Sequence, residues 1–133
     1  MIIDAHTHVG FGKAIEKRAK QLVAELDRAK VDKAMVFAGA INDCTNEALL
    51  KEIAPYKGRL FGVGSVSPNG PKAYRPSLAK MDAWLKRGDL RAIKFYLGYE
   101  PFYPNDARLR PYLKLLRKHG RPAIFHSGDT LAR

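Results

Sequence analysis

Short apolar runs alternate with longer amphipathic segments from one end of the chain to the other. Each run has the length of a buried strand, and in the segments between them apolar residues recur at the spacing of a helix face. We expect strands at 2–6, 34–38, 60–66, 92–97 and 122–126. Strands and helices that alternate in this way form a parallel sheet joined by right-handed crossovers. The chain is therefore predicted to fold as an α/β protein.

Residues that favour helix starts and ends lie between these strands. Gly88 and Gly120 are placed to end the third and fourth helices, because glycine adopts the left-handed conformation that closes a helix. A capping oxygen or a proline in the first turn favours a helix start. The predicted helices begin near Ile15, Asp43 or Thr45, Pro76 and Pro111.

The length of the repeating unit favours one of two architectures. Each strand and helix together take about 27 residues, close to the unit length of an eight-stranded barrel of about 250 residues. An open doubly wound sheet shows the same alternation, and periodicity does not separate the two. No G-x-G-x-x-G turn follows the first strand, which argues against the nucleotide-binding form of the doubly wound sheet. No linker or low-complexity segment interrupts the chain, so residues 1–133 are expected to form a single domain.

Composition narrows the class of protein. The chain has 24 Lys and Arg against 13 Asp and Glu, a formal net charge of +11, which could indicate nucleic-acid binding. The positive residues are spread along the predicted helices rather than gathered in one block, so we favour solvated helix faces and consider a nucleic-acid partner unlikely. The sequence has no apolar run that could cross a membrane and no signal peptide, so a cytoplasmic location is expected. The single Cys44 excludes an internal disulfide framework.

Three histidines lie at predicted strand ends. His6 and His8 are two residues apart on the first strand, so their side chains face the same side of the sheet. His126 ends the fifth strand, and the carboxyl ends of parallel strands are where α/β proteins place their active sites. Neutral imidazoles in this arrangement suit Zn²⁺ or another divalent transition metal. The alternative, ordinary polar residues at strand ends, suits the fourth histidine, His119, which falls in the last turn of a helix.

Three segments resemble motifs of a known family: IIDAHTHVG at 2–10, AIKFYLGYEPFYPND at 92–106 and PAIFHSGDT at 122–130. They are similar to the first-, fourth- and fifth-strand motifs of the amidohydrolase superfamily. The most similar branch is the amidohydrolase-related group that includes aminocarboxymuconate-semialdehyde decarboxylase. The resemblance covers the N-terminal half, or slightly more, of that fold. It implies about five strands of a TIM (β/α)8 barrel that is incomplete in this chain.

The resemblance also implies a function. In that family a divalent metal, usually zinc, would be held by His6, His8 and His126. The implied reaction is hydrolysis of a small organic acid, amide or lactone by metal-activated water, with decarboxylation as a variant. Family members carry a further histidine on the sixth strand and an aspartate on the eighth, and neither falls within this sequence. Asp129 is the only acidic residue near the same rim, which makes it a weak candidate for a catalytic base.

Three further residues are candidates for substrate binding. Lys94 lies on the fourth strand, where other amidohydrolase branches carry a carboxylated lysine that bridges two metals. We favour instead an inward lysine that pairs with Asp129 or with a substrate carboxylate. Tyr96 and Tyr99 lie in or just before the following loop, where a substrate could pack against them, although a hydrophobic loop cluster is an equal alternative.

Five parallel strands do not close an eight-stranded barrel, so the first and fifth strands should remain open edges. We expect the inner face, with Val36, Val63, Ile93 and Ile124, to lie open to water. Self-association, or pairing with a complementary barrel half, is therefore predicted. A non-catalytic half-barrel scaffold that retains the histidines is the alternative to an enzyme.

Overall fold

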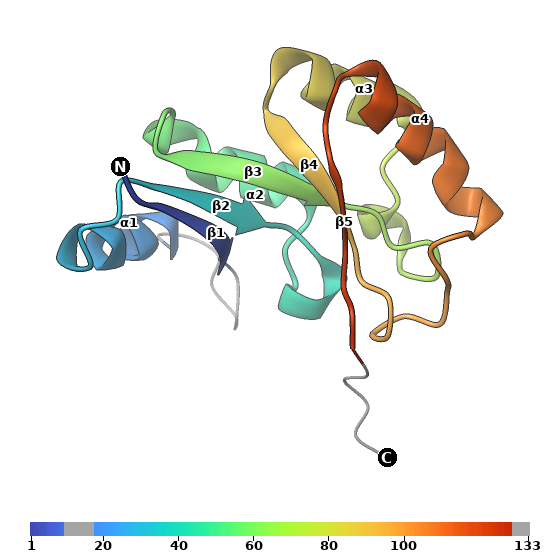
Figure 1. Cartoon of the computed structure of the whole chain (residues 1–133), viewed down its shortest axis with the longest axis horizontal. Coiled ribbons are helices and arrows are strands. Elements are labelled where there is room, and N and C mark those ends of the chain that lie inside the picture. Colours follow the sequence, from blue (N-terminus) through green and yellow to red (C-terminus); the bar gives the residue numbers. More distant parts are fainter. Residues whose placement is uncertain (10–17, 129–133) are drawn as a thin grey trace.

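The computed structural model describes residues 1–9 and 18–128. Within these ranges, strands and helices alternate as the sequence predicts, and all neighbouring strands are parallel (Figure 1). The elements are β1 (Ile3–His8), α1 (Arg18–Arg28), β2 (Lys33–Phe37), α2 (Asn46–Ile53), β3 (Leu60–Ser65), α3 (Leu78–Arg87), β4 (Leu90–Phe95), α4 (Arg110–Lys118) and β5 (Ala123–Phe125). The predicted start of the first helix at Ile15 lies outside the described residues.

The strands follow one another across the sheet in the order β1-β2-β3-β4-β5. In a doubly wound sheet the order of the strands across the sheet reverses at a switch point. The sequential order seen here excludes that alternative. The strand direction turns progressively from β1 to β5, and the sheet curls as a consequence (Figure 1). The fold is a curled half-barrel, as expected for part of a TIM barrel.

Local side-chain contacts fix where the helices begin and end. The Thr45 hydroxyl accepts a hydrogen bond from the Ala48 amide at 3.1 Å, so Thr45 rather than Asp43 caps α2. Ser77 caps α3 in the same way, through the amide of Lys80 at 3.3 Å. Gly88 ends α3 with φ at 74°, a left-handed conformation that glycine adopts without strain.

The four α-helices pack against one face of the sheet. Two clusters make up this layer, one around α1, α2 and the first three strands and one around α3, α4 and β4. Val36 belongs to the first cluster and Ile93 to the second, and both are fully buried. The expectation that these two residues face the barrel interior is therefore wrong. In a continuous apolar run the two faces carry similar side chains, so the run itself does not show which face is which.

The opposite face carries a small cluster of its own. Phe37, Val63 and Ala92 are buried there, and the half-buried Met35 and Ile124 pack against them. Val63 is 0% exposed, so the prediction that it lies open to water is also wrong. Because the sheet curls, side chains from neighbouring strands lean over one another and exclude water from the centre of the concave face.

Within residues 1–9 and 18–128, no further strand pairs with either edge of the sheet, as predicted. β1 and β5 each have one neighbouring strand. Large apolar side chains lie exposed at these edges, including Ile3 on β1 and Phe125 on β5. Such edges offer unpaired backbone groups to another chain or chain segment.

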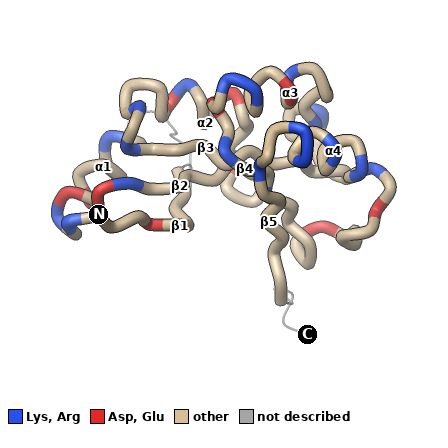
Figure 2. The backbone as a smooth tube through the Cα atoms, turned by 45° about the horizontal axis from the view of Figure 1, so that its top comes forward, with Lys and Arg blue, Asp and Glu red and all other residues tan. Residues whose placement is uncertain are grey.

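Lys and Arg are distributed over the outer helices (Figure 2). This distribution agrees with the solvated helix faces predicted from the sequence. Among the described residues, no helix is long and apolar enough to cross a lipid bilayer.

Candidate active site

The candidate site begins with an irregularity in β1. Asp4 is paired with Ala34 and Thr7 with Val36, so β1 carries one more residue than β2 between these pairs. A bulge of this kind re-aims the side chains that follow it. Thr7 is paired with the helix-facing Val36, and His8 is paired with Phe37, whose side chain lies on the concave face. The bulge therefore aims His8 at the barrel interior.

His6 and His8 form a pair beside Phe37. Their ring centroids are 5.0 Å apart, and the His6 ring stacks on Phe37 at 4.2 Å with an interplanar angle of 23°. The His8 ring lies 5.7 Å from the same phenyl ring. The structure thus confirms that both histidines face one side of the sheet, and it gives Phe37 the role of an apolar support under them.

Asn42, from the short 3-10 helix Ala40–Asn42, connects His8 to two strands. Its side-chain amide donates to the Phe37 carbonyl at 3.0 Å and to the Val9 carbonyl at 3.2 Å. The same nitrogen lies 3.3 Å from Nδ1 of His8. Asn42 is 2% exposed, so these contacts lie away from bulk water. It fixes the backbone on both sides of the His8 ring.

The environment keeps both imidazoles neutral. Burial lowers the pKa of His8 to about 4, with further contributions from the neighbouring His6 and Lys94. Burial also lowers the pKa of His6, and the positive charge of Lys94 acts in the same direction, while Asp4 opposes the shift. The neutral imidazole is the form of histidine that binds metal ions.

Lys94 is a buried cation next to this pair. Its side chain is 3% exposed, and its Nζ lies 5.9 Å from the Phe37 ring and 5.5 Å from the Tyr96 ring. No carboxylate of residues 1–9 or 18–128 forms an ion pair with it, and burial lowers its pKa. The predicted partner Asp129 lies outside the described residues. A buried amine without a protein carboxylate is suited to an anionic ligand.

Tyr96 and Tyr99 have different surroundings. The Tyr96 hydroxyl donates to the Ala38 carbonyl at 2.9 Å, and burial raises the pKa of this phenol. A Cβ on Gly39 would approach the Tyr96 ring to 2.6 Å, so only glycine fits there. Tyr99 is 44% exposed, and its ring centroid lies 4.6 Å from that of His126. The Tyr99 ring is thus exposed and the Tyr96 hydroxyl is engaged, and substrate binding by either residue stays a prediction.

His126 follows β5 at the same carboxyl edge. Its backbone amide donates to the Phe95 carbonyl at 2.9 Å, which extends the pairing of β4 and β5 by one bond. Its Nε2 is buried and lacks a hydrogen-bond partner among the described residues. The charge of His126 contributes to the lowered pKa of His6, so the two side chains lie within electrostatic range.

The donor set fits a divalent metal in part. His6 and His8 offer two adjacent neutral imidazoles, and Nε2 of His126 is buried with no hydrogen-bond partner among the described residues. Over residues 1–9 and 18–128, however, no group of three His, Cys, Asp or Glu side chains is gathered closely enough to hold an ion. The structure therefore brings two of the three predicted ligands together, and convergence of the third stays a prediction.

Sequence reasoning missed two residues that build this site. Phe37 supports the histidine pair, and Asn42 fixes the backbone around it. A polar residue a few positions after a predicted strand was the only available signal for Asn42. Its contacts reach residues 33 or 34 positions earlier in the chain, and local patterns do not encode such distances.

Solved structures with the same fold come from several bacteria. A protein assigned as 2-pyrone-4,6-dicarboxylic acid hydrolase from Acinetobacter baumannii, with citric acid bound, matches with a TM-score of 0.70 and 16% identity over 95% of this chain and 49% of its own. A 5-carboxyvanillate decarboxylase from Novosphingobium aromaticivorans, with manganese and 3-methoxy-4-hydroxy-5-nitrobenzoic acid bound, matches with a TM-score of 0.69 and 14% identity over 100% of this chain and 53% of its own.

A protein assigned as an amidohydrolase from Staphylococcus aureus matches with a TM-score of 0.69 and 12% identity, over 98% of this chain and 48% of its own. At these identities the likeness shows the fold alone. The chain spans about half the length of these three structures. No curated protein sequence matches it.

The sequence also matches the family model described as amidohydrolase, over residues 3–132. This match covers β1, β4 and β5, the strands that carry the three motifs noted above. Members of this superfamily are metal-dependent. The chain belongs to the amidohydrolase family.

Proposed function

We propose that this chain carries the metal-binding half of an amidohydrolase-type enzyme that acts on a small carboxylate substrate. The observation that carries the proposal is the pair of neutral imidazoles, His6 and His8, beside the buried ammonium of Lys94, which pairs with no carboxylate of residues 1–9 or 18–128. A metal-ligand pair next to a buried cation suits a substrate that presents a carboxylate near its reacting carbon.

Zn²⁺ is the proposed metal, and other divalent transition ions such as manganese are compatible with the same ligands. His6 and His8 would hold it, with His126 as the third ligand. A bound ion of this kind polarises a carbonyl oxygen and lowers the pKa of water, which makes a nucleophile available near neutral pH. The remaining steps depend on the residues around the ion.

Each of these residues has a role that its surroundings support. Phe37 and Asn42 hold the imidazoles in place, so that little reorganisation is needed on binding. Lys94 would bind and orient the substrate carboxylate, and the neighbouring aromatic rings exclude water from that contact. Tyr99 would pack against the body of the substrate. Asp129 is the proposed base, on the segment that follows His126 in the sequence.

Hydrolysis of a small organic acid, amide or lactone is the proposed reaction, and decarboxylation is the second candidate. The structural neighbours support this pair of candidates, because one is assigned as a hydrolase and another is named a decarboxylase. Both names specify compounds that carry carboxylate groups. The proposed class of substrate, a small carboxylate, is common to the two reactions.

A partner is part of the proposal. In the described part of the chain β1 and β5 each have one neighbouring strand, and apolar side chains lie exposed beside them. We propose that a second copy of the chain or a complementary barrel half covers these edges. Sedimentation velocity of the isolated chain should then show dimers or larger species, and a single sharp monomer would contradict self-association.

A non-catalytic scaffold is the rival function, because no three-membered ligand group is present among the described residues. Metal analysis separates the two. After reconstitution with Zn²⁺ and desalting, the wild-type chain should retain about one ion per chain, and His8→Gln should retain almost none. His119→Gln is the matched control, because His119 lies against Asp82 and away from the site. A wild-type chain without zinc, or equal loss in both variants, would favour the scaffold.

A further inference from the structure

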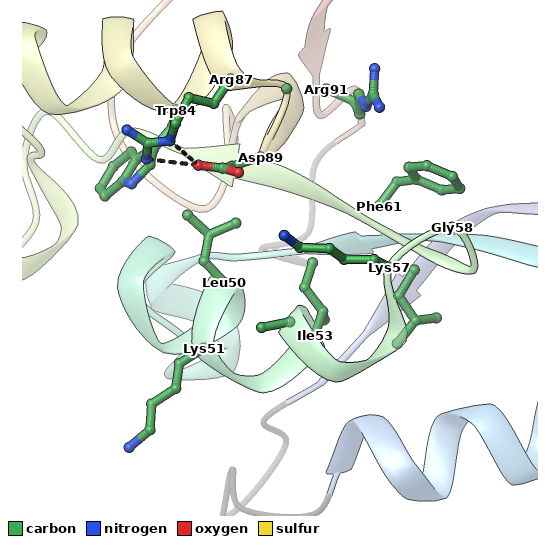
Figure 3. A pocket seen from close by; sticks show the side chains of 13 residues that line it. Leu50, Lys51, Ile53, Lys57, Gly58, Phe61, Trp84, Arg87, Asp89 and Arg91 are labelled. Atoms are coloured by element: carbon green, nitrogen blue, oxygen red, sulfur yellow. Dashed lines mark hydrogen bonds and ion pairs between the residues drawn. The ribbon is translucent and has the colours of Figure 1, made fainter.

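A pocket lies at the end of the sheet opposite the histidine pair, where β3 and β4 begin. Its volume is about 550 Å³, and α2, α3 and the turns that lead into β3 and β4 enclose it (Figure 3). Leu50 and Ile53 form part of its apolar floor, and Phe61 lies at one side (Figure 3). No residue of the candidate active site lines it.

The charged residues of this pocket are mostly positive. Lys51, Lys57, Arg87 and Arg91 line it, and Asp89 is the only acidic residue among those that do. Asp89 is already engaged, because its carboxylate accepts a hydrogen bond from Nε of Arg87 at 2.8 Å and pairs with Nη2 at 2.7 Å. The other three cations form no ion pair with a carboxylate of the described ranges. Figure 3 shows Lys57 extending into the middle of the pocket.

Two arginines beside the pocket have unsatisfied donors. Arg91, at the start of β4, and Arg121, just before β5, each have an Nε that is buried and has no hydrogen-bond partner within the described part of the chain. Both guanidinium groups lie against Gly88. The position of a Cβ on Gly88 is 3.5 Å from Cζ of Arg91 and 3.7 Å from Nη2 of Arg121. The two guanidinium groups therefore lie at the same glycine, and neither forms an ion pair with a carboxylate of residues 1–9 or 18–128.

Ordinary structural roles account for only part of this cluster. Lys51 and Arg87 lie in the last turns of α2 and α3, where positive side chains are stabilised by the helix dipole. Arg91 also lies over the Phe61 ring at 5.6 Å, a contact that needs no anion. Neither effect satisfies the buried Nε groups or offsets the repulsion between Arg91 and Arg121. An oxyanion held by the Nη groups beside Gly88 would offset that repulsion, because arginine donates in pairs to phosphate and carboxylate oxygens.

We propose that this pocket binds a small phosphorylated ligand, with Arg91 and Arg121 holding a phosphate group and the apolar floor receiving the rest of the molecule. The number of cations favours phosphate over a single carboxylate, because a phosphate monoester carries a charge of about −1.5 to −2 near neutral pH. Lys57 would meet a second negative group. The site is separate from the histidine pair and does not depend on the proposed function.

Calorimetric titration of the full chain with inorganic pyrophosphate at about 0.15 M salt tests the proposal. Pyrophosphate should bind the wild-type chain, and the double variant Arg91→Gln with Arg121→Gln should weaken binding by about tenfold or more. Arg28→Gln removes the same kind of charge from the exposed end of α1 and should leave the affinity unchanged. Circular dichroism of each variant verifies that it is folded.

Several results would overturn the proposal. A wild-type chain that does not bind pyrophosphate would refute the site outright. Equal weakening by Arg28→Gln would mean that binding depends only on the general positive charge of the chain. If citrate bound as tightly and depended in the same way on Arg91 and Arg121, the ligand class would be polycarboxylates and not phosphorylated compounds. A different result would be single-stranded DNA that binds more tightly than pyrophosphate, competes with it and loses affinity steeply with salt. That result would identify the pocket as a nucleic-acid site and not a small-ligand site. Unchanged pyrophosphate binding in His8→Gln would confirm that the two sites are separate.

Discussion

The two ends of the sheet hold their positive charges in opposite ways. At the carboxyl end a single ammonium, Lys94, is buried between aromatic rings and faces neutral histidines. At the amino end several cations, among them Arg91, line an open pocket, and Arg121 lies beside it at Gly88. At the carboxyl end the side chains of Asn42 and Tyr96 are hydrogen-bonded to backbone carbonyls, although Nε2 of His126 has no partner among the described residues. At the amino end Nε of Arg91 and Nε of Arg121 have no partner in the same part of the chain. A pre-organised site and a site that awaits its ligand therefore share one small domain.

The largest effect should come from the side chain that ties the carboxyl end together. Asn42→Ala removes the donors of two buried carbonyls and should lower the free energy of unfolding by about 3 kcal/mol. Asn105→Ala, at an exposed position, should change it by less than about 0.5 kcal/mol. Urea unfolding measures both. If the two variants lost similar small amounts, Asn42 would not be what holds this end together.

Because the carboxyl end of the sheet is closely packed, Gly39→Ala should lower the free energy of unfolding, but by less than Asn42→Ala does. The added methyl group would meet the Tyr96 ring, which should cost about 2 kcal/mol of unfolding free energy. The cost should be clearly smaller when Tyr96→Leu is already present, because the obstructing ring is then gone. A double-mutant cycle by urea unfolding measures this coupling, and an equal cost in both backgrounds would contradict it.

Because Lys94 is a buried cation, replacing it should weaken the binding of a carboxylate ligand without lowering the stability of the fold. Lys94→Met in the zinc-loaded chain should weaken the binding of isophthalate, an aromatic dicarboxylate, by about tenfold, and should leave stability unchanged or slightly raised. Lys33→Met is the control, because Lys33 also lies over an aromatic ring, that of Phe61, but outside the site. Calorimetry gives the affinities. Unchanged affinity for isophthalate in Lys94→Met would remove Lys94 from the proposed substrate site.

The smallest effect concerns acid stability where α3 meets α4. Hydrogen bonds from Lys118 and His119 lower the pKa of the Asp82 carboxyl below its usual range. Because the folded-state pKa is the lower one, the stabilisation is present above the unfolded pKa and is lost as the pH falls through the folded value. Asp82→Asn should therefore reduce the drop in urea midpoint between pH 7 and pH 3. Glu25→Gln, on α1, should leave that drop as it is in wild type, and an equal reduction in both variants would argue against the Asp82 contacts.

The sequence predicted the strands, the helices and the histidine pair because each depends on local pattern. Alternation of strand residues was enough to aim His6 and His8 to one side. The prediction that Val36 and Ile93 face the barrel interior was wrong, because a continuous apolar run does not show which of its residues face inward. The bulge in β1, the contacts of Asn42 and the approach of Arg91 to Arg121 arise only when distant segments meet. Patterns in a single sequence do not predict such long-range contacts.

A zinc-anomalous diffraction map of the zinc-loaded chain tests the central claim most directly. The account predicts one peak between the two rings on β1, about 2.0–2.1 Å from a nitrogen of His6 and a nitrogen of His8, with His126 as the third protein ligand. A fully loaded crystal whose zinc lies elsewhere, with the two rings bonded only to protein groups, would contradict it.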